Sequence, residues 1–225
     1  MSGRDLPTVS CVIAAYNEAA RIAETVRTVR SLDGIDEVIV VDDGSTDATP
    51  TLAASAGARV HTLSRNEGKA LAVARGVEEA RGRILLLLDA DLGTSAAAAG
   101  ELLAPVLAGS ADMTIATFPK TAHRGGFGWA VGLARWGIWR LAGRRLAAPL
   151  SGQRALVREA LPGDLGKRWE LEVGMTVAAL RRGFRVVEVP TRMTHRLTGR
   201  TPGDAAHRAG QLVGVAKALW RHRRD

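Results

Sequence analysis

Short apolar runs alternate with segments of helical periodicity along the first half of the chain, and this alternation restricts the fold more than any other feature. The runs are Val9–Ala15, Glu37–Val41, Arg59–Leu63 and Ile84–Leu88. They are rich in Val, Ile and Leu and have the length of buried strands. Between the first two, a helix is predicted over Asn17–Arg30, where Ile22, Val26 and Val29 recur at helical spacing. Such alternation predicts an α/β fold, a mostly parallel sheet flanked by helices.

The second half is less regular but continues the same kinds of element. The predicted strands are Met113–Thr117, Ala155–Val157 and Val186–Val189, and the predicted helices are 96–107, 129–141, 171–181 and 205–221. The last helix is amphipathic and basic, with an apolar stripe made of Leu212, Val213, Ala216 and Leu219. We therefore expect a single domain over residues 1–225, with a larger half at 1–119 and a smaller lobe at 120–225.

Composition is ordinary for a globular protein, with 46% hydrophobic and 24% charged residues. The single cysteine, Cys11, lies in an apolar run, so we expect a buried thiol and no disulfide framework. The start of the chain is polar, and no stretch reaches the roughly 18 to 20 apolar residues of a membrane span. A cytoplasmic location is the expectation.

Charge is divided unevenly along the chain. Residues 1–119 carry 10 Lys and Arg against 16 Asp and Glu, whereas residues 120–168 carry 10 against 2. Residues 192–225 are again basic, with 8 against 2. An acidic first half and a basic second half indicate two binding tasks and argue against a uniformly basic nucleic-acid binder, for which no recognition motif is present.

Polar motifs follow three of the predicted strands directly. They are Tyr16-Asn17-Glu18, Asp42-Asp43 and Asp89-Ala90-Asp91. Ligands of α/β sheets bind at the carboxyl ends of the strands, and this is where these motifs fall. The sequence therefore predicts a binding site that all three motifs share.

Asp89 and Asp91 form an Asp-x-Asp after the most apolar strand. Hard divalent cations prefer carboxylate oxygens, and Mg²⁺ often spans protein carboxylates and substrate phosphates. The pair can place one carboxylate at a metal and the other at a sugar or ribose hydroxyl. The alternative is that the pair caps the next helix or lies in a solvated loop.

Two further motifs have both a binding and a structural interpretation. Asp42 and Asp43 can accept hydrogen bonds from a base or a ribose, or can form an Asx-type turn before a helix, and the two roles are compatible. Gly68 permits a close backbone approach, and Lys69 is a point charge suited to phosphate. A Walker-type glycine run is missing, which disfavours a P-loop ATPase.

Four motifs in order resemble family 2 glycosyltransferases of the GT-A fold. They are VIAAYNEAARI, VVDDGSTDAT, NEGKALAVARG and LLLLDADL, and the resemblance is good over residues 8–93. It implies a GT-A type, Rossmann-like sheet in which residues 1–119 bind a nucleotide sugar and a metal ion. A nucleotidyltransferase would instead need a glycine-rich and basic signature where AAYNE stands.

The resemblance also implies roles for individual residues. The nucleoside pocket is formed by Ala15, Tyr16, Asn17, Glu18, Asp42 and Asp43, and is closed by Gly68 and Lys69. Asp89 and Ala90 contact the donor. Asp91 binds the Mn²⁺ or Mg²⁺ that bridges the diphosphate and stabilises the departing charge.

The second half resembles two groups of relatives. The loop Pro149–Ala155, with Ser151, Gly152 and Arg154, is similar to the acceptor-side loop of polyprenyl-phosphate sugar synthases and of glucosyl-3-phosphoglycerate synthases. Residues 169–174 and 194–196 resemble the latter group. That likeness implies a catalytic glutamate, Glu170 or Glu172, and a third metal-site residue, His195. The acceptor then meets Arg154 and Arg196.

Only one of the two glutamates can face the reacting centre, because residues two apart on a helix point in different directions. In an inverting mechanism it is the general base for the acceptor hydroxyl, and in a retaining mechanism it positions the acceptor. The chain departs from the phosphoglycerate enzymes after Gly125-Gly126, where Phe127-Gly128-Trp129-Ala130 replaces an Arg and a Thr that hold the acceptor. This departure argues against phosphoglycerate.

Tryptophan and arginine are interleaved in GWAVGLARWGIWRL, residues 128–141. Such composition is typical of a helix that lies in a membrane interface, and the basic end LWRHRRD repeats it. The alternative is a buried helix or a homodimer contact with arginines at the rim.

These observations together predict a metal-dependent hexosyltransferase that moves a sugar from a nucleotide diphosphate, with UDP favoured, to an anionic acceptor. The first alternative is a polyprenyl-phosphate glycosyltransferase using a GDP- or UDP-sugar, bound peripherally at the inner face of the membrane. The others are a nucleotidyltransferase and an inactive nucleotide-binding module.

Overall fold

The computed structural model describes residues 8–118, 128–163, 165, 171–194 and 213–220. The strands are β1 (Val9–Ala15), β2 (Glu37–Asp42), β3 (Arg59–Thr62), β4 (Ile84–Asp89), β5 (Met113–Thr117), β6 (Arg154–Val157) and β7 (Val186–Pro190). The α-helices are α1 (Ile22–Arg30), α2 (Thr49–Ser55), α3 (Lys69–Glu79), α4 (Ala99–Leu107), α5 (Gly128–Ala142), α6 (Leu171–Arg181) and residues 213–220. Short 3₁₀ helices are η1 (Gly93–Ala98) and η3 (Arg158–Ala160).

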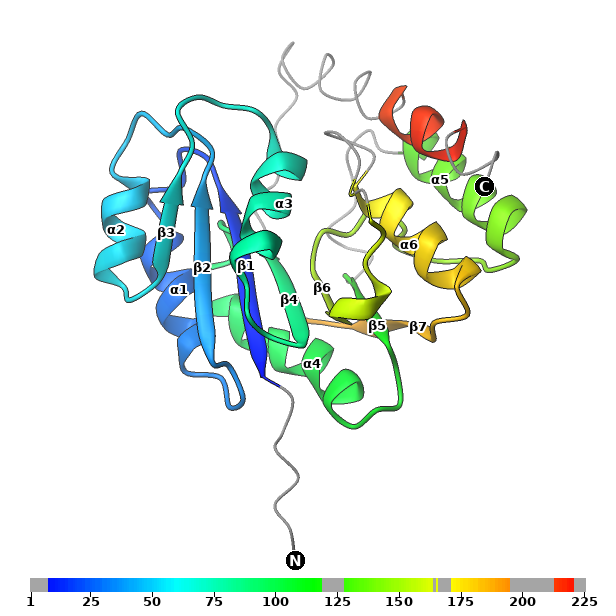
Figure 1. Cartoon of the computed structure of the whole chain (residues 1–225), viewed down its shortest axis with the longest axis horizontal. Helices are drawn as coiled ribbons and strands as arrows, with labels where there is room; N and C mark the ends of the chain where they lie inside the picture. The colour runs from blue at the N-terminus through cyan, green and yellow to red at the C-terminus, as the bar shows by residue number, and fades with distance from the viewer. Residues whose placement is uncertain (1–7, 119–127, 164, 166–170, 195–212, 221–225) are drawn as a thin grey trace, which may run out of the picture.

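Seven strands form one sheet in the order β3-β2-β1-β4-β6-β5-β7 (Figure 1). The first four are mutually parallel, β7 is parallel to β5, and β6 runs antiparallel to both of its neighbours. This arrangement confirms the prediction of a mostly parallel sheet flanked by helices. The reversed strand β6 matters for the site, because it starts beside the carboxyl end of β4, with Arg154 opposite Leu87.

The sheet is covered on both faces because strand side chains alternate between them. Val12 of β1 packs in the cluster formed with α3, α5 and α6. Its neighbours Cys11 and Ile13 pack in the opposite cluster, with α1, α2 and α4. Cys11 is fully buried as predicted, and its burial raises the pKa of the thiol. The result is three layers with the sheet in the middle (Figure 1).

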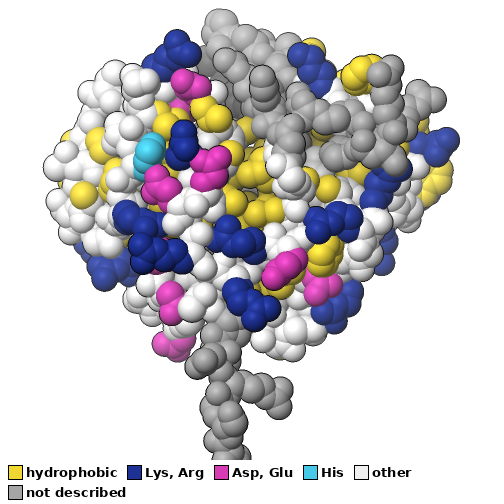
Figure 2. All heavy atoms as spheres, viewed as in Figure 1, with side chains coloured by type: hydrophobic (Ala, Val, Ile, Leu, Met, Phe, Trp, Pro, Cys, Tyr) yellow, Lys and Arg dark blue, Asp and Glu magenta, His cyan; other side chains and the backbone are white. Residues whose placement is uncertain are grey.

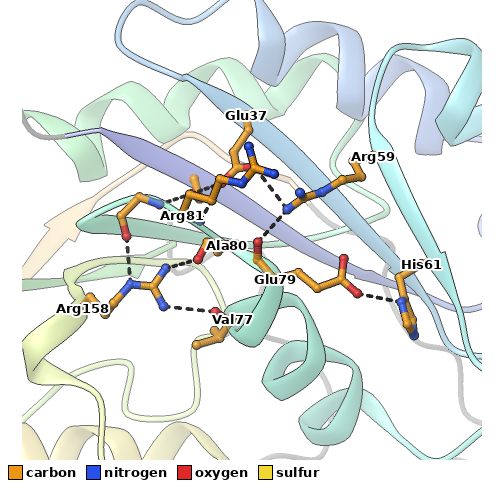
Figure 3. A network of polar contacts seen from close by, with 10 residues as sticks. Glu37, Arg59, His61, Val77, Glu79, Ala80, Arg81 and Arg158 are labelled. Atoms are coloured by element: carbon orange, nitrogen blue, oxygen red, sulfur yellow. Dashed lines mark hydrogen bonds and ion pairs between the residues drawn. The ribbon is translucent and has the colours of Figure 1, made fainter.

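The amino-terminal edge of the sheet is closed by a polar network (Figure 3). Arg158 donates to the carbonyl oxygens of Val77, Ala80 and Gly82 at 3.0, 2.6 and 2.9 Å, which satisfies the end of α3 and the turn after it. Arg59 pairs with Glu37 at 3.2 Å. Figure 2 shows Lys and Arg gathered with a few acidic groups over this lower part of the molecule. The network ties β2, β3, α3 and η3 together, away from the polar motifs.

Helix α1 begins at Ile22, five residues later than the start we expected at Asn17. Asn17 adopts a left-handed conformation, with φ 54°, which is incompatible with helix. The backbone amides of Asn17 and Glu18 donate instead to Ser45 and Thr49, at 2.9 and 2.8 Å. The segment after β1 is therefore a loop held against the loop after β2.

Residues 213–220 pack across α5 with a face different from the predicted one. Leu219 is buried as expected, and it lies where any side chain at Gly137 would stand. Val213 and Ala216 are exposed, and Val215 and Ala218 are buried in their place. Leu212 lies outside the described residues. In the described parts of the chain, no helix has the length and apolar character needed to cross a bilayer.

Candidate active site

The strand register brings the three polar motifs to one edge of the sheet. Ala15 of β1 lies opposite Asp42 of β2, and Ala14 lies opposite Asp89 of β4. The motifs that follow these strands therefore share the carboxyl edge, as the sequence predicted. This edge is the start of the candidate active site.

The loop after β1 leaves one aromatic side chain exposed. Ala15 is buried, and its carbonyl accepts the Asp43 amide at 2.8 Å. The Asn17 side-chain oxygen accepts the Thr46 amide at 2.9 Å. Tyr16, between them, is 45% exposed. The loop is thus fixed by its neighbours while the Tyr16 ring remains available at its surface.

Asp42 and Asp43 both turn toward backbone amides. Asp42 is fully buried and accepts the Ser45 amide at 3.3 Å, which is the Asx-type turn that the sequence allowed. The two oxygens of Asp43 accept the amides of Glu67 and Gly68 at 2.8 and 2.9 Å. These bonds join the loop after β2 to the segment before α3, and binding of a nucleoside by either carboxylate stays a prediction.

Lys69 connects the first half of the chain to the second half. Gly68 has φ 100°, a conformation that favours glycine, and it starts α3 so that Lys69 points to the sheet edge. The Lys69 ammonium lies 2.6 Å from Asp89 Oδ1 and 3.5 Å from Glu172 Oε1. Burial opposes its charge, but the two carboxylates outweigh that effect and raise the pKa of Lys69 above its ordinary value. Lys69 is therefore a fixed cation at neutral pH.

Gln153 is a site residue that the sequence analysis did not single out. Its side-chain amide donates to Asp89 Oδ2 at 2.6 Å, while Lys69 holds the other oxygen of the same carboxylate. An added Cβ at Gly152 would stand against the Lys69 ammonium, so a larger residue here would displace the end of that side chain. The reversed strand β6 creates this contact, and its only signal in the sequence is a polar residue in the loop before β6.

Thr25 of α1 anchors the turn that carries Asp91. Its hydroxyl donates to the Ala90 carbonyl and accepts the Gly93 amide, both at 2.8 Å, inside the protein. Arg21 donates to the Asp91 carbonyl at 3.3 Å. The backbone on both sides of Asp91 is thus hydrogen-bonded to Thr25 and Arg21, and these bonds fix the backbone position from which the Asp91 side chain extends.

Arg154 holds the loop that precedes β6. The guanidinium is fully buried and donates to the carbonyls of Pro149 and Ser151 and to the Thr176 hydroxyl, at 3.1, 2.8 and 2.7 Å. Burial lowers the pKa of Arg154 to about 10, which the carboxylates of Glu172 and Glu188 partly oppose, so it is charged at neutral pH. Its contact with an acceptor stays a prediction, since these bonds give it a structural role.

The structure describes one of the two candidate glutamates. Glu172 lies in the first turn of α6, where the helix dipole favours a carboxylate, and it reaches Lys69. Ser151 is nearly buried in the loop, and its hydroxyl donates to Gln153 at 3.3 Å. Three further candidates lie outside the described residues: Glu170, His195 and Arg196.

The acidic pair has the chemistry of a site for a metal ion that is shared with a substrate. In the described ranges, no three His, Cys, Asp or Glu side chains form a group able to hold a metal ion. Mg²⁺ and Mn²⁺ at nucleotide sites use one or two carboxylates, with phosphates and water as the other ligands. Asp89 is already held by Lys69 and Gln153, and Asp91 follows two residues later. This donor set fits such a cation.

Comparison with known proteins identifies the family. The model of "Glycosyl transferase family 2" matches residues 10–155. Glycosyltransferase AglD of Haloferax volcanii is 35% identical over 201 residues, which is 81% of this chain and 32% of that protein. Glucosyl-3-phosphoglycerate synthase of Mycolicibacterium paratuberculosis is 30% identical over 203 residues, 78% of this chain and 60% of the synthase. The chain thus spans about one third of the archaeal relative's length.

Solved structures agree. Glucosyl-3-phosphoglycerate synthase from Mycobacterium tuberculosis, in complex with Mn²⁺, UDP-glucose and glycerol 3-phosphate, superposes with a TM-score of 0.76 at 26% identity. The match covers 95% of this chain and 80% of that one. It confirms the GT-A type of the fold. Because the family model matches the polar motifs at the carboxyl edge of the sheet and extends to the start of β6, the chain belongs to glycosyl transferase family 2.

Proposed function

We propose that this protein transfers a sugar from a UDP-sugar to a phosphate-bearing acceptor with the help of a divalent cation. The observation that carries the proposal is the pair of contacts made by Lys69, which joins Asp89 of the Asp-x-Asp to Glu172 of α6. A transferase has to hold donor and acceptor side by side. In this proposal the part of the chain with Asp89 holds the donor, the part with Glu172 holds the acceptor, and Lys69 contacts both.

The donor side is supported by the linked loops at the carboxyl edge. Asp43 holds the amides of Glu67 and Gly68, so the loops after β2 and before α3 form one rigid wall. Tyr16 offers an exposed ring on the neighbouring loop for a nucleobase to stack on. A solved relative of this fold is bound to UDP-glucose, which makes uridine the favoured base.

Asp91 is the proposed metal ligand. A bound Mn²⁺ or Mg²⁺ would neutralise the negative charge that develops on the leaving nucleotide diphosphate. The chain's own contribution is to hold the carboxylate in place: Thr25 fixes the carbonyl of Ala90 and the amide of Gly93 on either side of it. Lys69 adds a permanent positive charge beside Asp89, which lies two residues before Asp91 in the same motif.

The acceptor side is formed by the loop Ser151–Gln153 and by Glu172. Arg154 holds the loop by a hydrogen bond to the Ser151 carbonyl, and Gln153 holds it by a hydrogen bond to Asp89. Glu172 lies against Lys69 and is the proposed residue that meets the acceptor hydroxyl. The basic composition of residues 120–168 favours an anionic acceptor.

A nucleotide-release assay tests this function. UDP-sugars and GDP-sugars are each offered with Mn²⁺ and with one of four acceptors: glycerol 3-phosphate, 3-phosphoglycerate, and their uncharged or phosphate-free counterparts glycerol and glycerate. We expect release of UDP that requires the metal and rises with a phosphate-bearing acceptor. Release that is indifferent to the acceptor's phosphate contradicts the acceptor assignment, and no release from any donor contradicts the whole proposal.

Family membership favours sugar transfer over nucleotidyl transfer. The remaining alternative from a different class is an inactive nucleotide-binding module, which would bind UDP without releasing it from a UDP-sugar. The second candidate acceptor is a polyprenyl phosphate, and a short-chain polyprenyl phosphate in the same assay distinguishes it from the soluble phosphates.

A further inference from the structure

Three tryptophans of α5 share one exposed side of the helix. Trp129, Trp136 and Trp139 are 85%, 57% and 44% exposed. At about 100° per residue they fall within about 80° of one another around the helix axis. The opposite side of the same helix packs into the protein through Ala134 and Ile138, which are fully buried. The helix is therefore apolar on its outer side as well as its inner side.

Positive charge flanks these tryptophans. Arg135 and Arg140 lie on either side of the tryptophan stripe, and Arg144 and Arg145 follow the helix, all exposed. The Arg145 guanidinium lies 5.5 Å from the centre of the Trp139 ring. Residues 128–149 contain no Asp or Glu at all. A surface that combines tryptophan with arginine alone is complementary to an anionic, partly apolar partner.

The C-terminal helix extends this surface. Leu219 packs at Gly137 of α5, so residues 213–220 are fixed across the helix. From there, Trp220, Val213 and Lys217 are exposed. Figure 1 places both helices at one side of the molecule, and Figure 2 shows apolar and basic side chains along that edge. We call the set Trp129, Trp136, Trp139, Arg140, Lys217 and Trp220 the tryptophan face.

We propose that the tryptophan face docks on the surface of an anionic lipid bilayer. Indole rings are amphipathic and favour the boundary between headgroups and acyl chains, and flanking arginines pair with lipid phosphates. A helix exposed to water alone would carry polar residues on this side. The partner must offer an apolar layer beneath a negatively charged surface. An anionic lipid bilayer has both.

Docking in this way would orient the candidate active site. Helix α6 packs against α5, and its first turn carries Glu172. A membrane bound at α5 would therefore lie one helix away from α6, which carries the proposed acceptor-side residue Glu172. The docking itself needs no donor, metal or turnover, so it is measured independently of the proposed function.

Vesicle flotation tests the proposal. The wild-type chain is mixed with vesicles of phosphatidylcholine containing phosphatidylglycerol, or of phosphatidylcholine alone, and the floated fraction is measured together with the tryptophan emission. We expect flotation with the anionic vesicles and a blue shift of the emission. The double variant Trp129→Ser/Trp136→Ser should lower the partition coefficient at least about tenfold, because two indoles no longer enter the interface. Leu71→Gln, which removes an exposed apolar residue of α3, is the matched control and should float as the wild type does.

Sedimentation of the same proteins distinguishes a lipid surface from a second copy of the chain. If the tryptophan variant floats as the wild type does, the proposal is overturned. It is equally overturned if the wild type ignores both kinds of vesicle, and a dimer that the double variant converts to a monomer would then assign the face to self-association. Because both substituted side chains are exposed, an unchanged thermal transition in the variant is expected and keeps the comparison valid.

Discussion

Asparagine in place of Asp91 is expected to reduce metal-dependent UDP release by about a thousandfold, because one neutral amide replaces the carboxylate proposed to hold the cation. Asparagine keeps the size of the side chain. The backbone on either side is held by Thr25 and Arg21 and does not depend on the Asp91 carboxylate. The substitution should therefore remove a charge at the site and leave the fold intact. Initial rates at saturating donor, measured over a range of Mn²⁺ concentrations, give the size of the effect.

The matched control is Asp33→Asn, which makes the same chemical change at an exposed position outside the site. It should keep the wild-type rate and the wild-type dependence on Mn²⁺. An Asp91→Asn protein whose rate still rises with Mn²⁺ as the wild type's does would refute the role of this carboxylate.

Methionine in place of Arg154 is expected to lower the free energy of unfolding by about 3–5 kcal/mol, a loss typical of removing a buried, fully bonded charge. The change removes the hydrogen bonds that the carbonyls of Pro149 and Ser151 accept, and it leaves the Thr176 hydroxyl with its bond to the Glu172 carbonyl. It also removes the positive charge that faces Glu172 and Glu188. Urea denaturation followed by circular dichroism measures the change through its midpoint and slope.

Arg154→Lys separates charge from geometry. Lysine keeps the positive charge but cannot reach three acceptors in different directions. We therefore expect the free energy of unfolding of this variant to lie between those of the wild type and the methionine variant. A methionine variant as stable as the wild type would show that the loop is held by other contacts, and the brace assigned to Arg154 would be wrong.

The alternation of apolar runs was sufficient to predict the parallel part of the sheet. Buried strands in such a sheet need no polar face, so runs such as Ile84–Leu88 are conspicuous in the sequence. A helix was also predicted near Leu171–Arg181, where α6 lies. The motifs after β1, β2 and β4 meet as expected because parallel strands end at the same edge.

Long-range contacts were beyond the sequence patterns. The contact from Gln153 to Asp89 depends on β6 running antiparallel beside β4, and no local pattern encodes that pairing. The start of α1 was predicted too early because Asn17 is drawn into bonds with the loop after β2, and tertiary contacts override the helical periodicity that follows. Thr25 was missed for the same reason, since a threonine inside a helix gives no sign of the turn it holds.

The central claim is that the carboxyl edge of this sheet binds a nucleotide diphosphate sugar together with a divalent cation. Calorimetric titration of the chain with UDP-glucose, GDP-mannose and related donors, each with and without Mn²⁺, tests it most directly. The account predicts that a UDP-sugar binds in the presence of Mn²⁺ and much more weakly without it. Failure of every donor to bind in the presence of the metal, or binding that Mn²⁺ does not change, would contradict it.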